Sequence, residues 1–600
     1  MTRNRLLPAL AATAALSLAV SAAGAEPASA SGPGQGRQNA WVGRTLRAMT
    51  LEEKVGQLFV PYVTGGTADT ASQENLDRFG VATPAEAVQK LHLGGVIYFA
   101  WSGNTASPAQ IATLSNGLQR AALRSGRDRP GRNRDRAVPL TIATDQETGL
   151  VARVLAPATQ FPGAMALGAG RDLRATRDTF AITAAELSAI GINTDYAPDA
   201  DVNVNPANPI IGVRSFSSRP DLVADHVTAA VTGLQRDADI SAVAKHFPGH
   251  GDTGTDSHTD LPVITHTRAQ WEQIDAPPFR AAIAAGIDSI MTAHISFPAL
   301  EPSGDPSTLS KKVLTGMLRE ELGFRGVIAT DSLRMAGVRQ MYSDPEIAIR
   351  AVEAGADVLL DPQQPLVQYR ALVDAVRSGR LSERRIDASV RRILAMKYER
   401  GVVRQPFVSE RAVPRRVGTP AHLARAQQIT DRTPTLLEDD ADLVPLPAGK
   451  VLVTGWGASG VPLLASKLTD RGHPATGYYA GASPTAAQVA TAVTQAQTAD
   501  VVVVTTSGAA TNARQQALVA ALVATGKPVL VVALGTPYDI AALPGVRSYL
   551  ATYSSTSVAL ESVARLLDGA ITPRGTLPVD IPSSADPTQV LFPFGSGLTS

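Results

Sequence analysis

The sequence predicts an α/β protein: a TIM-like (β/α)8 barrel followed by a smaller C-terminal α/β sandwich domain. Three observations predict this order. Short apolar segments alternate with helix-length stretches up to about residue 401, a segment rich in proline and arginine interrupts the pattern, and further apolar segments follow it. A chain of 600 residues is long enough for two or three such domains.

The N-terminus predicts a cleaved secretory signal peptide over residues 1–30. It has Arg3 and Arg5, then an apolar run rich in alanine and leucine, then small residues ending at Ala25 or Ala30. The run is too short to span a membrane, and no later apolar run is long enough to do so. We therefore expect a secreted protein without a membrane span, with retention at the cell wall as an option.

The barrel is predicted over residues 38–402. Its eight expected strands are 57–61, 95–99, 139–144, 193–197, 242–246, 289–293, 326–330 and 357–361. Polar residues stand at or just beyond several of these strand ends, namely Asp145, Lys245, His246, His294 and Asp331. Because a barrel collects its active site at the C-terminal ends of its strands, these side chains are candidates for catalysis.

Residues 403–447 are predicted to be a linker with one helix, and residues 448–600 the sandwich domain. In the latter, the apolar segments KVLVTG, DVVVVTT, PVLVVAL and SYLATY alternate with alanine-rich helical stretches, which predicts a mostly parallel sheet. The glycines of GWGASG, Gly455 to Gly460, resemble a dinucleotide-binding loop. The acidic residue expected after the next strand is missing, so we interpret these glycines as a tight turn.

Composition excludes several classes of protein and site. The formal net charge of +1 argues against capture of nucleic acid by the protein as a whole. The lack of cysteine excludes disulfides, thiol catalysis and thiolate metal sites. The arginine-rich segment 124–136 is most simply a solvated loop, with docking on an anionic cell-wall polymer as the alternative. We expect a small glycan as the only partner and a monomer, although the sequence does not fix the oligomeric state.

A metal site is the first interpretation to weigh for KHFPGHGDTGTDSH, Lys245 to His258. Its first two histidines cannot share a helical face, as a zinc motif requires, because Phe247, Pro248 and Gly249 separate them. Residues 199–210 resemble half of a calcium loop, but Val204 stands where the glycine is needed and Ile210 where the bidentate glutamate is needed. We predict neither a metal nor another cofactor.

Acid-base and nucleophilic chemistry remains. Asp331 could cap the next helix, but a titratable cluster on another loop of the same barrel mouth favours a nucleophilic carboxylate. Asp256 and His258 are two residues apart, which in an extended segment puts both side chains on one side. A carboxylate fixes the tautomer of an imidazole and favours its protonated form, as an acid catalyst needs. A purely structural histidine is the alternative.

Motifs through nearly the whole chain carry a family resemblance. They include LEEKVGQLF (51–59), ATDQETGLVAR (143–153), KHFPGHGDTGTDSHTDLP (245–262) and GVIATDSLRMAGV (326–338). In these motifs the sequence resembles glycoside hydrolase family 3, specifically its NagZ-type β-N-acetylglucosaminidase branch. Thr148 and Leu150 depart from the pattern, where a glycine and an arginine are expected, which bears on the preference for the leaving group.

The resemblance implies a retaining exo-β-N-acetylglucosaminidase acting on peptidoglycan fragments or chitooligosaccharides. By the same resemblance, Asp331 would form a covalent glycosyl-enzyme, His258 would be the acid/base, and Asp256 would tune it. The residues that would hold the hydroxyls of the departing sugar are Asp145, Arg214, Lys245 and His246.

Two alternatives stay open at this point. One is a phosphorylase with the same residues, because an imidazole repels an incoming phosphate less than a carboxylate does. The other is a non-catalytic glycan-binding protein of the cell wall.

Overall fold

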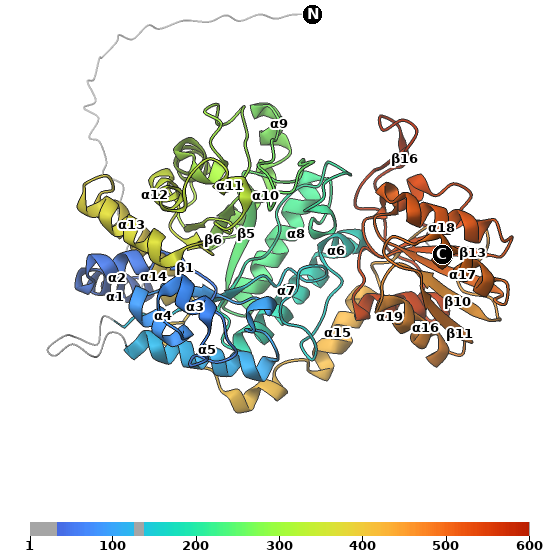
Figure 1. Cartoon of the computed structure of the whole chain (residues 1–600), viewed down its shortest axis with the longest axis horizontal. Coiled ribbons are helices and arrows are strands. Elements are labelled where there is room, and N and C mark those ends of the chain that lie inside the picture. The colour runs from blue at the N-terminus through green and yellow to red at the C-terminus, as the bar shows by residue number, and fades with distance from the viewer. Residues whose placement is uncertain (1–32, 125–136, 599–600) are drawn as a thin grey trace, which may run out of the picture.

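The computed structural model describes residues 33–124 and 137–598 (Figure 1). The predicted signal peptide and all of the arginine-rich segment except Arg124 lie outside the described residues. Among the helices of the described residues, none is long and apolar enough to cross a membrane.

All eight predicted barrel strands are present. Their bounds are β1 Phe59–Val60, β2 Gly95–Ile97, β3 Thr141–Thr144, β4 Thr194–Asp195, β5 Ser241–Phe247, β6 Ser289–Thr292, β7 Val327–Ala329 and β8 Leu359–Leu360. Strands β2 to β7 form a parallel sheet in sequence order, and β1 pairs in parallel with β8. Parallel bridges from Tyr62 to Ile97 and from Ala329 to Val358 join the two sheets, so the barrel closes.

Helices surround the barrel, and a single hydrophobic cluster fills the space between helices and strands. The helices described in this part of the chain are α1 Pro33–Ala48, α2 Leu51–Gly56, α3 Gln73–Phe79, α4 Pro84–Leu91, η1 Ala100–Ser102, α5 Pro108–Arg124, α6 Ala164–Gly170, α7 Leu173–Ala189, η3 Gly212–Arg214, α8 Pro220–Thr232, η4 Gly233–Asp237, α9 Arg268–Gln273, α10 Ala276–Ala284, η5 Ser307–Leu309, η6 Lys312–Glu321, α11 Ala336–Arg339, α12 Asp344–Ala354, α13 Pro365–Arg377 and α14 Glu383–Glu399. Local sequence explains several helix starts. Thr83 and Glu86, for example, form a capping box that satisfies backbone donors at the start of α4.

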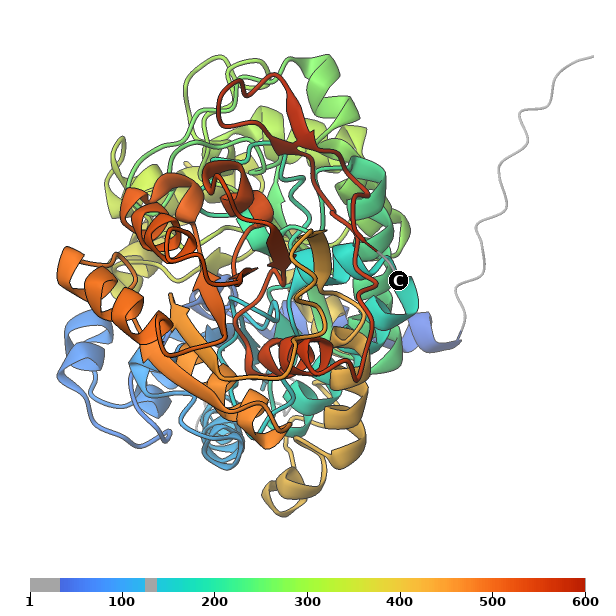
Figure 2. The same ribbon diagram turned by 90° about the vertical axis from the view of Figure 1, so that its right-hand side faces the viewer.

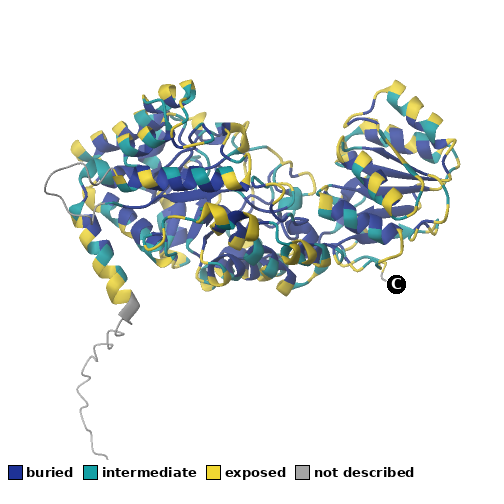
Figure 3. Ribbon diagram, turned by 90° about the horizontal axis from the view of Figure 1, so that it is seen from below, coloured by how far each residue is buried: buried dark blue, intermediate teal, exposed yellow. Residues whose placement is uncertain are grey.

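The C-terminal domain is an α/β sandwich around a six-stranded sheet with the order β11-β10-β12-β13-β14-β9. The strands are β9 Thr435–Asp439, β10 Val451–Gly455, β11 Ala475–Tyr479, β12 Val501–Thr506, β13 Val529–Ala533 and β14 Ser548–Ala551, with a small hairpin of β15 Ile581–Pro582 and β16 Val590–Phe592. Helices α16 Gly460–Asp470 and α19 Ser557–Leu567 cover one face, and α17 Ala486–Ala496 and α18 Ala513–Val523 cover the other. Figure 3 shows the buried strands inside each domain and exposed positions on the outer helices.

One boundary differs from the sequence prediction. The segment expected as a linker, 403–447, contains the predicted helix, α15 Pro420–Thr430, but also β9. Strand β9 pairs antiparallel with β14, so the sheet of the C-terminal domain begins before residue 448. The sequence hides this strand because its partner in the sheet lies more than a hundred residues later in the chain.

The two domains meet at α6 and α15 (Figure 1), and Figure 2 looks onto the C-terminal domain with the barrel behind it. Met165, Ala166 and Ala169 of α6 belong to the hydrophobic cluster of the C-terminal domain. Polar contacts reinforce the junction, since Ser217 donates to the carbonyl of Pro578 and the Asn203 side chain lies 3.3 Å from the Tyr538 hydroxyl. The C-terminal domain therefore supports the loop after β4, which carries Arg214.

Candidate active site

A cavity of about 430 Å3 opens at the C-terminal ends of the barrel strands. Its lining residues fall between Ile97 and Gln363, so the cavity is built by the barrel. It brings together most of the residues singled out in the sequence: Asp145, Arg214, Lys245, His246, His258 and Asp331. Of the other two candidates, Asp256 is hydrogen-bonded to His258, and His294 is buried with hydrogen bonds to Thr308 and to the carbonyl of Ser332.

Buried ion pairs form one side of the cavity. The ammonium of Lys245, from β5, lies 3.0 Å from Oδ1 of Asp145 and 2.6 Å from Oε1 of Glu147. Two nitrogens of Arg214 donate hydrogen bonds to Glu147, and each lies 2.8 Å from one of its carboxylate oxygens. Burial alone would raise the pKa of Glu147, but Arg214 and Lys245 hold it well below its usual value. Glu147 is therefore an anion that fixes two cations in place.

Glu147 was not predicted as a site residue. A signal was available, because it stands two residues after Asp145 at the end of β3, where side chains of alternate residues point the same way. Its partner Arg214 is 67 residues away in sequence, so the pair becomes visible only in the fold.

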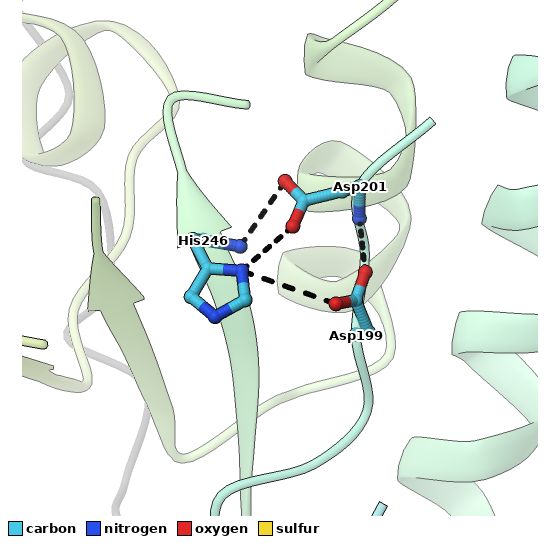
Figure 4. Close-up of side chains that lie close together, drawn as sticks. All are labelled: Asp199, Asp201 and His246. Carbon is cyan, nitrogen blue, oxygen red and sulfur yellow. Dashed lines mark hydrogen bonds and ion pairs between the residues drawn. The ribbon is translucent and has the colours of Figure 1, made fainter. Parts of the chain in front are cut away.

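His246 is oriented by two aspartates of the loop after β4 (Figure 4). Its Nδ1 lies 2.7 Å from Oδ2 of Asp201 and 3.9 Å from Oδ2 of Asp199. Burial would raise the pKa of Asp201, but His246 and the backbone N–H of His250 lower it. Because an ionised carboxylate only accepts hydrogen bonds, Nδ1 of His246 donates and Nε2 is left facing Nη2 of Arg214 at 3.4 Å.

The same three residues are close enough to be considered as metal ligands, since their ligand atoms lie within 4.8 Å of one another. Asp201, however, already accepts from Nδ1 of His246 and from the backbone N–H groups of His246 and His250. The guanidinium of Arg214 lies 3.7 Å from Asp199 and would repel a cation. Burial and the charge of Asp201 also raise the pKa of Asp199 well above its usual value. These contacts favour a role in positioning His246.

Asp331 follows β7 and points its carboxylate into the cavity. It does not cap a helix, because the next helix, α11, begins at Ala336 with Met335 at its N-cap. Burial would raise the pKa of Asp331, but the imidazoles of His246 and His294 and the backbone N–H of Ser332, 2.7 Å from Oδ1, lower it below its usual value. The site therefore keeps this carboxylate ionised, as a nucleophile must be.

His258 stands at the rim of the cavity on an open loop, with 61% of its side chain exposed. Its Nδ1 lies 2.8 Å from Oδ1 of Asp256, and the same oxygen accepts from the backbone N–H of His258. The pair forms in a turn and not in the extended segment that the spacing of the two residues predicts. The turn brings the two side chains together because Asp256 bonds backbone and imidazole at once.

The loop that carries His258 is fastened at two places. His250 bonds through Nδ1 to Thr253 and through Nε2 to Ser257, at 2.9 Å and 3.0 Å. The carbonyls of Ser257 and His258 accept from the backbone N–H groups of Gly337 and Ala336. The loop is thereby joined to the segment after β7, which carries Asp331.

Comparison with known families decides the identity of the fold. The model of the glycosyl hydrolase family 3 N-terminal domain matches residues 50–396, and that of the family's C-terminal domain matches residues 434–600. The chain belongs to glycosyl hydrolase family 3. Within this family 3 chain, the cavity lies in the part that the N-terminal model covers, and β9 falls at the start of the second match.

Named relatives agree with this assignment. The family 3 chain is 37% identical over 395 residues to β-hexosaminidase A of Pseudoalteromonas piscicida, a match that spans 60% of this chain and 63% of that relative. It is 28% identical over 583 residues to a β-N-acetylglucosaminidase/β-glucosidase of Cellulomonas fimi, covering 90% of this chain and 95% of that one. The structure of a family 3 β-N-acetylglucosaminidase from Paenibacillus sp. FPU-7 superposes with a TM-score of 0.79 at 37% identity, covering 89% of this chain and 99% of that one.

Proposed function

We propose that this protein is a retaining exo-β-N-acetylglucosaminidase that hydrolyses terminal, non-reducing N-acetylglucosamine from glycans. One observation carries the proposal: an ionised, half-buried carboxylate on Asp331 and an exposed imidazole on His258 paired with Asp256 line the same cavity. Two-step displacement needs a nucleophile and a proton donor of this kind. The relatives named β-hexosaminidase and β-N-acetylglucosaminidase support the choice of sugar.

In the first step, the carboxylate of Asp331 attacks the anomeric carbon as the bond to the leaving oxygen breaks. His258 gives its proton to that oxygen, and Asp256 holds the imidazole with Nδ1 protonated so that Nε2 delivers the proton. In the second step, His258 takes a proton from water, the water attacks the anomeric carbon, and the bond to Asp331 breaks. Two inversions give net retention of configuration.

The proposed sugar contacts come from Asp145, Arg214, Lys245 and His246. Each of them is held by a buried partner, so the hydrogen-bonding groups are oriented before the substrate arrives. Preorganisation of this type keeps the entropic cost of binding low.

We propose that the natural substrates are peptidoglycan fragments or chitooligosaccharides, met outside the cytoplasm. The proposal of export rests on the pattern at residues 1–30. The chain has no cysteine, so an oxidising environment outside the cytoplasm would find no thiol to oxidise.

The test is release of p-nitrophenol from the aryl β-N-acetylglucosaminide by the protein without residues 1–30, with and without phosphate and with a chelator. We expect turnover that needs neither phosphate nor a metal, with the β-anomer of the sugar formed first in NMR spectra. Turnover only with phosphate, with sugar 1-phosphate as product, would make the protein a phosphorylase. A folded sample that binds glycans without turnover would contradict the enzymatic proposal.

A further inference from the structure

A group of unpaired arginines lies on the side of the barrel opposite the candidate active site. It comprises exposed residues from the end of α5, from the segment after α14 and from the short helix η7 Glu410–Arg415: Arg120, Arg124, Arg404, Arg411, Arg415 and Arg416. We call this group the arginine face. Figure 1 shows α5 beside the segment that follows α14 along the lower edge of the barrel.

Specific contacts hold these segments together. The carboxylate of Glu410 accepts hydrogen bonds from Thr113 and Asn116 of α5, at 2.8 Å and 2.9 Å. The Asn116 side chain also bonds both backbone groups of Val408. The arginine face is therefore built on segments that side-chain hydrogen bonds join to one another.

A cavity of about 500 Å3 adjoins the arginine face, and Arg404 and Arg416 contribute to its lining. Residues 188–193 and 238–240 form the opposite wall. These residues precede β4 and β5, whereas the candidate active site follows the strands. The cavity and the arginine face therefore belong to the N-terminal end of the barrel.

None of the six arginines forms an ion pair with another described residue. Three exposed arginines elsewhere, Arg177, Arg377 and Arg380, are paired with carboxylates and serve for comparison. The acidic residues near the arginine face offset only part of its charge, because Glu410, whose pKa Asn116, Thr113 and Arg120 lower, and Asp239 in the cavity wall carry two negative charges against six positive ones. In a chain with a net charge of only +1, this is a local excess of positive charge.

We propose that the arginine face is a docking surface for a phosphodiester polymer of the cell wall. A guanidinium is always charged and binds phosphate oxygens through two parallel hydrogen bonds, and several of them spaced over one surface suit a repeating anion. Docking at this end leaves the mouth of the barrel, at the other end, open to glycans. The choice of a wall polymer depends on the proposed export, but the surface itself is independent of the proposed hydrolysis.

The test is cosedimentation of the protein with insoluble cell walls, before and after acid extraction of their phosphodiester polymer. The variant Arg411→Gln/Arg415→Gln/Arg416→Gln removes half of the arginine face. The matched control Arg177→Gln/Arg377→Gln/Arg380→Gln removes the same charge from paired arginines elsewhere. Aryl glycoside turnover, which needs none of these six positions, checks that each variant is folded.

We expect the wild type to bind intact walls, to release them as salt rises, and to bind extracted walls much less. The arginine-face variant should bind intact walls about tenfold more weakly, since it loses several charge contacts, while the control changes less than about twofold. Equal binding to extracted walls, an equal loss in the control variant, or tighter binding to duplex DNA than to the polymer would overturn the proposal. Cosedimentation measures binding and not turnover, so each of these outcomes can be measured even if the protein does not hydrolyse glycans.

Discussion

Replacing Glu147 by Gln tests whether the buried ion pairs hold the sugar-binding cations in place. The carboxylate of Glu147 lies 2.6 Å from the ammonium of Lys245 and 2.8 Å from two nitrogens of Arg214. Removing one partner of a buried pair costs about 3–5 kcal/mol, because a charge is left without compensation. Asp145 still lies 3.0 Å from Lys245, so we expect the lower end, a loss of about 3 kcal/mol in the free energy of unfolding.

The same substitution should lower kcat/KM. Because Arg214 and Lys245 would lose their fixed positions, we expect kcat/KM to fall about 100-fold. A fall of this size corresponds to a loss of roughly 2.7 kcal/mol of transition-state stabilisation. The free energy of unfolding is measured by urea denaturation followed by tryptophan fluorescence, and kcat/KM with the aryl glycoside. Glu346→Gln is the control, because its carboxylate pairs with Arg380 near the surface and its loss should cost less than about 1 kcal/mol.

The double variant Glu147→Gln/Arg214→Met separates a pairwise effect from two independent ones. If the pair acts as a unit, the double variant should lose less stability than the sum of the single losses. A Glu147→Gln protein that keeps its stability within about 1 kcal/mol and its kcat/KM within about threefold would refute the reasoning.

Further predictions address the reaction and the core. His258→Ala should lower the turnover of disaccharides at least ten times more than the turnover of an activated aryl glycoside. General acid catalysis contributes roughly 10²-fold or more to the rate, and only where the leaving oxygen needs a proton. Equal losses in the two assays would contradict the role of His258. Asp331→Ala should abolish covalent labelling by a slow fluorinated substrate analogue, as mass spectrometry of the intact protein would show. Lys397 is buried, its hydrogen-bond partners among the described residues are Gln57 and the carbonyl of Gly94, and burial lowers its pKa to about 7. The unfolded chain holds this proton up to about pH 10.5, so stability should rise between pH 7 and 10.5 by at most about 1.4 kcal/mol per pH unit, and Lys397→Met should remove that slope in urea denaturation.

The sequence was sufficient for the barrel and for the residues at its strand ends. Strand ends are readable because an apolar run that stops at a charged residue marks the point where the buried strand meets the active-site face. Asp331, directly after β7, and Lys245 and His246, in the last residues of β5, were found in this way.

Residues whose role depends on a distant partner were not found. Glu147 acquires its role from Arg214, and Asp201 acquires its role from His246, which is 45 residues away. In the sequence, Asp199 and Asp201 resemble part of a calcium loop, because the spacing of acidic residues does not show which groups their side chains contact in the fold. Strand β9 was missed for the same reason, since its pairing with β14 is a long-range contact.

The two proposed reacting groups lie in opposite environments, and the chemistry explains why. A nucleophilic carboxylate gains from a place beside fixed cations and imidazoles, because they lower its pKa and keep it ionised. An acid/base must change its protonation state twice in each cycle and exchange protons with water, so an exposed imidazole suits it better than a buried one. The loop of the exposed His258 is joined by backbone hydrogen bonds to Gly337 and Ala336, in the segment that follows the half-buried Asp331. Substitutions that loosen these bonds should therefore slow protonation of the leaving group while leaving the ionisation of Asp331 intact.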